Sequence, residues 1–166
     1  MSKSKSGKGA VGPSGEKVLA TNRRASFDYE LGEKFEAGIA LIGSEARSIR
    51  TTSPGIGEAF IEVDRRGEAW VKQMRIAAMP HAAFSHDELR PRKLLLHRRE
   101  LDRMRAATER EGMTLIPTRL YYKGGRAKLE LAVARGKKMH DKRQSLREKT
   151  ANDEARAAMA RGRKDY

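Results

Sequence analysis

Short segments of the chain alternate between hydrophobic and polar residues, which is the pattern of β-strands that bury one face. In residues 35–42 the larger apolar side chains take every second position: Phe35, Ala37, Ile39 and Leu41. The positions between them are small or polar, so this second face is open to an approaching molecule: Glu36, Gly38 and Ala40. A glycine inside a strand commonly marks a bulge or a tight bend. We therefore expect such a feature at Gly38.

Two further pairs of apolar segments are joined by short polar turns. Residues 59–63 and 69–76 flank the turn 64–67, which ends in a glycine. Residues 113–122 and 127–134 flank the turn 123–126. Its Gly124-Gly125 pair is the stronger hairpin signal, because tight two-residue turns require positive φ. The sequence thus predicts two antiparallel hairpins.

Residues 97–112 change to the period of an α-helix. The helical spacing is carried by Leu94, Leu101, Met104 and Thr108. Gly112 stands where a left-handed residue commonly follows a helix. A shorter helix is expected over residues 44–50, with Ser44 as its N-cap, before the Ser-Pro-Gly break at residues 53–55.

These elements predict a mainly β fold with flanking helices. Short curled strands with glycines at the bends and one intervening helix fit an antiparallel β-barrel of the oligonucleotide/oligosaccharide-binding (OB) type. A β-sandwich with an added helix fits the same pattern, and strand order is left open. We expect a disordered basic N-terminal tail over residues 1–20, the barrel domain over 21–135 and a basic C-terminal tail over 136–166.

The net charge of +14 is concentrated at the two ends of the chain. Residues 1–24 carry a net +5 and residues 135–166 a net +6. Basic tails gain affinity for a polyanion by releasing counterions, so a nucleic acid is the expected partner, with a merely basic protein as the alternative. No apolar segment approaches the length of a membrane span, and residues 2–15 do not resemble a signal peptide. We expect a cytoplasmic protein that does not bind membranes.

Catalytic and metal chemistry is poorly supported. Cysteine is absent, which excludes disulfides, zinc-thiolate sites and cysteine nucleophiles. The one histidine-rich neighbourhood, His81, His86, Asp87 and His97, matches no metal-ligand spacing, and a capping or hydrogen-bonding role suits each residue better. We expect no enzyme and no cofactor, and keep a metal-dependent nuclease built on His86, Asp87 and His97 as a minor alternative.

A dense group of cations precedes and opens the longer helix. It consists of Arg90, Arg92, Lys93, His97, Arg98 and Arg99. Guanidinium groups can grip a phosphate in two places, although a solvated helix face with i,i+4 ion pairs is the plain alternative. The few aromatic residues suit the core better than base stacking, with Tyr29 as the exception because acidic residues flank it.

Several blocks, in order along the chain, carry a family resemblance. They are Asn22-Arg23-Arg24-Ala25, Tyr29, residues 35–45 (FEAGIALIGSE), residues 86–97 (HDELRPRKLLLH) and residues 137–143 (KKMHDKR). Together they resemble small protein B (SmpB), the SsrA-binding protein family of bacterial trans-translation, over about residues 20–150. The segment 150–166 matches the family in charge and alanine content alone, and we do not expect it to form an independent helix.

The resemblance implies an OB-type barrel that binds the tRNA-like domain of transfer-messenger RNA (tmRNA). Members escort this RNA, with elongation factor Tu, to ribosomes stalled on messages that lack a usable stop codon. The C-terminal tail is implied to be unstructured when free and helical in the empty message channel beyond the decoding centre of the small subunit. Such a tail needs no core of its own, because ribosomal RNA supplies the surface against which it orders. We expect a monomer.

The resemblance also assigns residues. Contact with tmRNA is implied for Asn22, Tyr29, Glu36, Leu95, His97 and Gly136, and the cationic group adds Arg92 and Lys93. The ribosome-contacting tail would comprise Lys137, Lys138, His140, Asp141, Lys142 and Arg143, with His140 suited to stacking on a base. A barrel that coats any single-stranded nucleic acid is the alternative function.

Overall fold

The computed structural model describes residues 15–80, 84–110 and 112–162. Its strands are β1 (Lys17–Thr21), β2 (Tyr29–Ile39), β3 (Phe60–Val63), β4 (Ala69–Lys72), β5 (Arg92–Leu95), β6 (Met113–Lys123) and β7 (Arg126–Gly136). Its helices are α1 (Ala25–Asp28), α2 (Gly43–Thr51), α3 (Arg98–Thr108) and α4 (Met139–Gly162).

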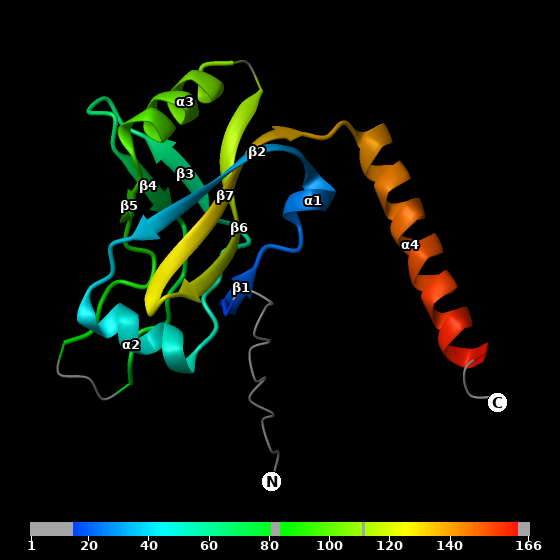
Figure 1. Ribbon diagram of the computed structural model, residues 1–166, viewed down its shortest axis with the longest axis horizontal. Coiled ribbons are helices and arrows are strands. Elements are labelled where there is room, and N and C mark those ends of the chain that lie inside the picture. Colours follow the sequence, from blue (N-terminus) through cyan, green and yellow to red (C-terminus); the bar gives the residue numbers. More distant parts are fainter. Residues whose placement is uncertain (1–14, 81–83, 111, 163–166) are drawn as a thin grey trace, which may run out of the picture.

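The strands form one antiparallel sheet that curls into a small barrel (Figure 1). Pairing runs β6-β3-β4-β5-β2-β7, and β7 pairs again with β6 through a long hairpin. The barrel is joined loosely at one point, because among the described residues the β3–β6 ladder has one pair, Ile61 opposite Leu115. The predicted mainly β, OB-like architecture with flanking helices is confirmed.

The core confirms the alternation read from residues 35–42. Phe35, Ala37 and Ile39 are buried, whereas Glu36 and Ala40 are exposed. The three buried side chains pack against Leu129 and Leu131 of β7 and against the buried side of the other strands. α3 covers one end of this core and contributes the fully buried Met104.

Both predicted hairpins are present. In the β3–β4 turn, Gly67 has φ of 79°, and Asp64 accepts hydrogen bonds from the backbone N–H groups of Arg66 and Glu68, both at 2.9 Å. In the β6–β7 turn, Gly124 and Gly125 have φ of 58° and 74°. The two glycines allow the two-residue turn that keeps β6 and β7 paired up to their ends.

The structure lacks the bulge expected at Gly38 and the N-cap expected at Ser44. Gly38 is not at a bulge but is paired on both sides, opposite Leu95 of β5 and Lys128 of β7. The bulge of β2 lies between Leu31 and Lys34. Ser44 does not cap α2, because the helix already begins at Gly43 and the Ser44 hydroxyl bonds His86 instead.

Three elements have no counterpart in the sequence pattern: β1, α1 and β5. β1 adds to the edge of β6, with Val18 opposite Tyr121 and Thr21 opposite Arg119. Its start at Lys17 lies inside the segment 1–20 that was expected to be disordered, so the sheet begins before the expected boundary. Residues 1–14 lie outside the described residues.

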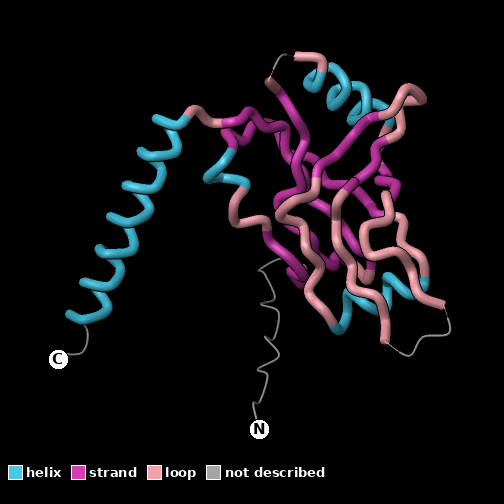
Figure 2. The backbone as a smooth tube through the Cα atoms, turned by 180° about the vertical axis from the view of Figure 1, so that it is seen from behind, coloured by secondary structure: helices cyan, strands magenta, loops and turns pink. Residues whose placement is uncertain are grey.

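α4 stands apart from the barrel and meets it beside α1, as Figures 1 and 2 both show. Most of its described side chains are exposed, including the apolar Leu146 and Met159. The tail is thus helical without the ribosome, whereas the family resemblance implies a helix only in the message channel. Alanine at several of its last positions and the ordinary polar helix formers around them favour this conformation locally.

Candidate nucleic-acid interface

The bulge in β2 gathers predicted RNA-contacting residues on one face of the sheet. Residues directly opposite each other in an antiparallel pair project to the same face. Tyr29 lies opposite Gly136, and Glu36 lies opposite Glu130. Positions 130 and 136 of β7 share a face, so Tyr29 and Glu36 share it too, although they are seven residues apart in β2. The extra residue of the bulge makes this possible.

Glu36 is held as an oriented anion on this outer face. Its carboxylate accepts hydrogen bonds from the Tyr121 hydroxyl and, at 3.3 Å, from Lys123 Nζ. The bond from Tyr121 lowers the pKa of Glu36 most, and Lys123 and Lys128 add to this against the opposing effect of burial. Burial of the phenol and its bond to Glu36 raise the pKa of Tyr121. A fixed carboxylate of this kind can accept further hydrogen bonds from base or ribose donors.

Leu95 and His97 lie next to this anion along β5 and the start of α3. Leu95 is 55% exposed and sits opposite Gly38. A Cβ added at Gly38 would come within 3.2 Å of Leu95 Cβ, so the glycine makes room for this leucine. His97 is exposed just before the first residue of α3, where its backbone N–H donates to Glu100 Oε2 at 3.0 Å.

Arg92 must be removed from the predicted RNA interface. Its side chain is fully buried, with Nε 2.7 Å from Glu45 Oε1 and one terminal nitrogen 2.6 Å from the carbonyl oxygen of Met74. Arg90 binds the same carboxylate of Glu45 at 2.8 Å. The dense cationic group therefore divides in two, because part of its charge neutralises a buried acid inside the protein.

Lys93 is half exposed and pairs with Glu68 at 3.0 Å. Its location on β5 leaves it near the outer face, and its contact with RNA stays a prediction. Arg98 and Arg99 are exposed in the first turn of α3.

Asn22, Tyr29 and Gly136 form a second group at the α1 end of the barrel. Asn22 donates from its side-chain amide to the carbonyl oxygen of Pro117 at 3.0 Å, and its Oδ1 is buried without a partner among the described residues. Asn22 and Tyr29 line a hollow of about 290 Å³ together with residues of α1 and β3. The fold thus brings the predicted RNA-contacting residues together as two neighbouring groups, apart from Arg92.

Two of the predicted ribosome-contacting residues hold α4 against α1. Lys137 Nζ donates to the carbonyl oxygen of Ser26 and to Ser145 Oγ, both at 2.8 Å. Lys142 Nζ lies 3.6 Å from Asp28 Oδ1. Lys138 and Arg143 are exposed. His140 and Asp141 belong to the first turn of α4, but their side chains lie outside the described part of the chain.

One member of the histidine-rich neighbourhood, His86, has a structural role in the barrel. His86 is buried, and its ring nitrogens lie 2.9 Å from Ser44 Oγ and 2.9 Å from the carbonyl oxygen of Ile76. This confirms the expected hydrogen-bonding role. No group of three metal-ligating side chains occurs among the residues described, and His81 lies outside them. Nor does any helix in the described ranges have the length and apolar character needed to cross a membrane.

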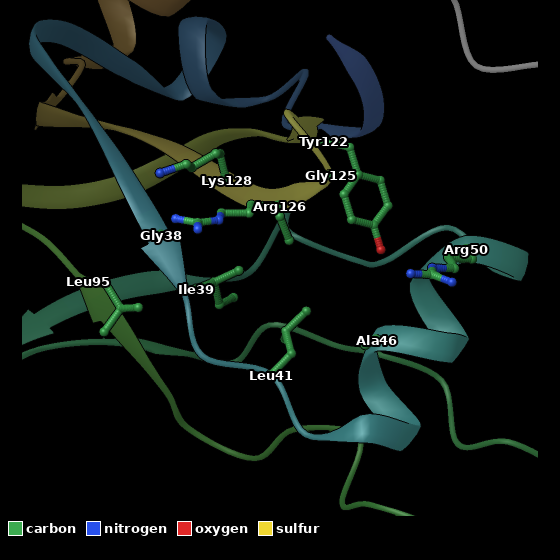
Figure 3. A pocket seen from close by; sticks show the side chains of 11 residues that line it. Gly38, Ile39, Leu41, Ala46, Arg50, Leu95, Tyr122, Gly125, Arg126 and Lys128 are labelled. Atoms are coloured by element: carbon green, nitrogen blue, oxygen red, sulfur yellow. The ribbon is translucent and has the colours of Figure 1, made fainter.

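A second hollow, of about 420 Å³, opens at the mouth of the barrel between α2 and the β6–β7 hairpin (Figure 3). Gly38 and Leu95 line it, so it adjoins the face that carries Glu36. Sequence reasoning missed this hollow and also missed Tyr121 and Lys123 as partners of Glu36. Both depend on pairing between β2, β7 and β6, for which the local pattern of any one strand gives no signal.

Comparison with known proteins agrees with the earlier resemblance. The family model described as SmpB protein matches residues 19–161. The SsrA-binding protein of Sorangium cellulosum is 49% identical over 152 residues, covering 92% of this chain and 93% of the relative. That of Parvibaculum lavamentivorans is 45% identical over 151 residues, covering 89% and 92%.

A solved structure described as "tmRNA-SmpB: a journey to the center of the bacterial ribosome" has a similar fold. It aligns with a TM-score of 0.63 and 37% sequence identity, covering 78% of this chain and 95% of that chain. With 37% of the aligned residues identical, the two chains share sequence as well as the general architecture of the barrel.

Proposed function

The chain belongs to the SmpB family of SsrA-binding proteins, and on this premise we propose that it binds the tRNA-like domain of tmRNA and brings it to stalled ribosomes in trans-translation. The barrel recognises the RNA and the tail engages the ribosome. The protein acts as an RNA-binding adaptor in ribosome rescue and nascent-chain tagging, in the cytoplasm, where ribosomes work. It acts as a monomer, and elongation factor Tu accompanies the RNA complex.

The observation that carries this proposal is the shared outer face of β2 and its neighbours. The bulge of β2 turns Tyr29 to the face of Glu36, and Leu95 and His97 continue this surface on β5 and α3. The surface combines an oriented carboxylate, an exposed leucine and a histidine. Such a mixture suits a folded RNA with unpaired bases better than it suits a uniform phosphate backbone.

The tail supports the second half of the proposal. α4 carries basic residues along an almost fully exposed helix. A helix with no apolar face to bury is suited to a surface that supplies its own contacts, and ribosomal RNA supplies phosphates. We assign Lys137, Lys138, His140, Asp141, Lys142 and Arg143 to contacts at the decoding centre and in the empty message channel.

Binding measured across a salt series tests the first half. The full chain is titrated with the tRNA-like half of tmRNA and, as control, with an unrelated structured RNA of equal length. A preference for the former that persists as salt rises is expected, because shape-specific contacts survive when counterion release is suppressed. Equal, steeply falling affinities would contradict the proposal and favour the general nucleic-acid-binding barrel.

Removal of residues 137–166 tests the division of labour. We expect the truncated protein to bind the tRNA-like half with largely unchanged preference and to lose tagging of nascent chains on stalled ribosomes. Normal tagging by the truncated protein would refute a ribosomal role for the tail. Loss of RNA preference would instead place part of the RNA site in the tail.

A further inference from the structure

The hollow at the mouth of the barrel has a chemically uniform rim. Three cations line it, Arg50 from α2 and Arg126 and Lys128 from the β6–β7 hairpin, and its lining contains no acidic residue. None of these cations forms an ion pair with the residues that the structure describes, although many other basic side chains of the barrel do. The hollow is therefore complementary to an anion.

The wall and floor of the hollow are apolar. Ile39 and Leu41 continue from β2, and Tyr122 extends from β6 toward α2, as Figure 3 shows. Tyr122 and Leu41 are half-buried. The cavity of about 420 Å³ is large enough for a nucleotide and far smaller than a helical segment of RNA. An aromatic ring facing aliphatic side chains below a cationic rim is the arrangement that accepts a flat base attached to a phosphate.

The neighbourhood favours RNA as the source of this nucleotide. Gly38 and Leu95 belong both to the hollow and to the outer face with Glu36, and the charge of Lys128 acts on Glu36. A strand leaving the outer face toward α2 would thus pass over the hollow without interruption. Single-stranded loops in folded RNAs can place an unstacked base in such a position.

We propose that this hollow holds one unpaired nucleotide of the RNA that binds the outer face. The base stacks on Tyr122 and packs against Ile39 and Leu41, and Arg50, Arg126 and Lys128 contact its phosphates. This inference rests on the proposed function and adds a nucleotide subsite, with Tyr122, Arg50 and Arg126 as residues that recognise the RNA.

Charge removal at the rim provides the first test. Arg126→Gln is expected to lower affinity for the tRNA-like half about three- to tenfold, and to reduce the slope of log affinity against log salt by about one. Arg65→Gln is the matched control, because Arg65 is also exposed but lies in the β3–β4 turn at the α3 end of the barrel (Figure 1). The proposal would be overturned if both variants lost affinity equally, or if neither variant lost affinity.

The ring of Tyr122 is tested separately. Tyr122→Leu should lower affinity roughly tenfold, as loss of one base–aromatic stack does, and Tyr122→Phe should bind as the parent does. A photoreactive benzoylphenylalanine in place of Tyr122 keeps an aromatic ring there, and it should cross-link to one unpaired nucleotide. This measurement decides the matter even if Tyr122→Leu fails to fold. Cross-links scattered over paired segments would overturn the proposal.

Free nucleotides distinguish the source of the ligand. A nucleoside monophosphate alone should bind only weakly, because it lacks the rest of the RNA contacts, and micromolar binding would show that the hollow serves a free nucleotide instead. Binding by the parent chain distinguishes a failure of the proposed function from a failure of the nucleotide subsite. If it has no preference for the tRNA-like half, the proposed function fails. If that preference persists unchanged in the rim and ring variants, the nucleotide subsite alone fails.

Discussion

At the scale of single residues, Glu45 organises the end of the barrel next to α2. Its carboxylate is fully buried and accepts bonds from Arg90, Arg92 and the backbone N–H of Ile42. Burial alone would raise the pKa of Glu45, but these bonds and the charge of Arg92 outweigh it and hold the pKa below its ordinary value. A buried carboxylate of this kind is stable only while its cations are present.

Glu45→Gln should therefore destabilise the protein strongly. Arg92 would remain buried without a counterion, and breaking a buried pair in this way costs about 3–5 kcal/mol. Urea unfolding followed by circular dichroism measures the change. Glu62→Gln removes an exposed pair with Lys72 and should cost less than about 1 kcal/mol. Similar losses in both variants would refute the special role of Glu45.

The same carboxylate makes stability depend on pH. Because the pKa of Glu45 is lower in the folded chain than in the unfolded chain, its contribution is complete above the unfolded-state value and is lost as pH falls through the folded-state value. We expect the free energy of unfolding to decrease as pH falls below about 5. Glu45→Gln should flatten this dependence. An unchanged slope in the variant would assign the acid sensitivity to other carboxylates, of which Glu130 also has a lowered pKa.

Tyr121→Phe should raise the pKa of Glu36. The phenol is the largest influence that lowers this pKa, and phenylalanine keeps the ring while removing the donor. Carbon-detected NMR titration of the Glu36 carboxyl measures the shift. Tyr122→Phe, one residue further along β6, should leave the titration unchanged.

At the scale of elements, the strands with alternating residues could be predicted and those stabilised by a distant partner could not. β2 shows its buried face in its own residues, from Phe35 to Ile39. β1 has only five residues, and it becomes a strand because the edge of β6 is available to it. The position of the β2 bulge is set by pairing with β7, so the sequence did not reveal that Tyr29 and Glu36 share a face.

In the candidate site, too, residues whose role depends on a distant partner could not be predicted from the sequence. The exposed positions Glu36, Leu95 and His97 could be found from sequence and family resemblance. Arg92 looked like one cation among several, and only its neighbour Glu45, 47 residues earlier in the chain, makes it a buried structural residue. The three cations of the barrel mouth come from α2 and β7, so no single motif joins them.

The contact between α1 and α4 also leads to a prediction. Asp28→Asn removes the ion pair with Lys142, which is partly exposed and worth less than about 1 kcal/mol. Backbone amides in the first turns of α4 should then exchange with solvent a few times faster, as measured by hydrogen exchange. Glu154→Gln, far along the same helix, should leave those amides unchanged. Equal protection in Asp28→Asn would show that Lys137 alone holds the helix.

At the scale of the whole molecule, the compact barrel is separate from the protruding helix α4. The barrel holds the buried hydrophobic core and carries the outer face and the hollow at its mouth. α4 adds cations but hardly any buried surface. The uneven charge of the sequence anticipated this separation, since more than half of the net +14 lies near the two ends of the chain.

Because α4 is attached to the barrel at one end only, its length sets the distance of its tip from the barrel. α4 has 24 residues, which sets its length at about 36 Å. Each residue deleted between its attachment and its tip would draw the tip back by about 1.5 Å and rotate it by about 100°. The tagging of nascent chains, measured over a series of such deletions, should therefore not decline smoothly. Tagging should recover partly whenever about a whole turn is removed, because the same side chains then point in their original direction from a slightly shorter helix.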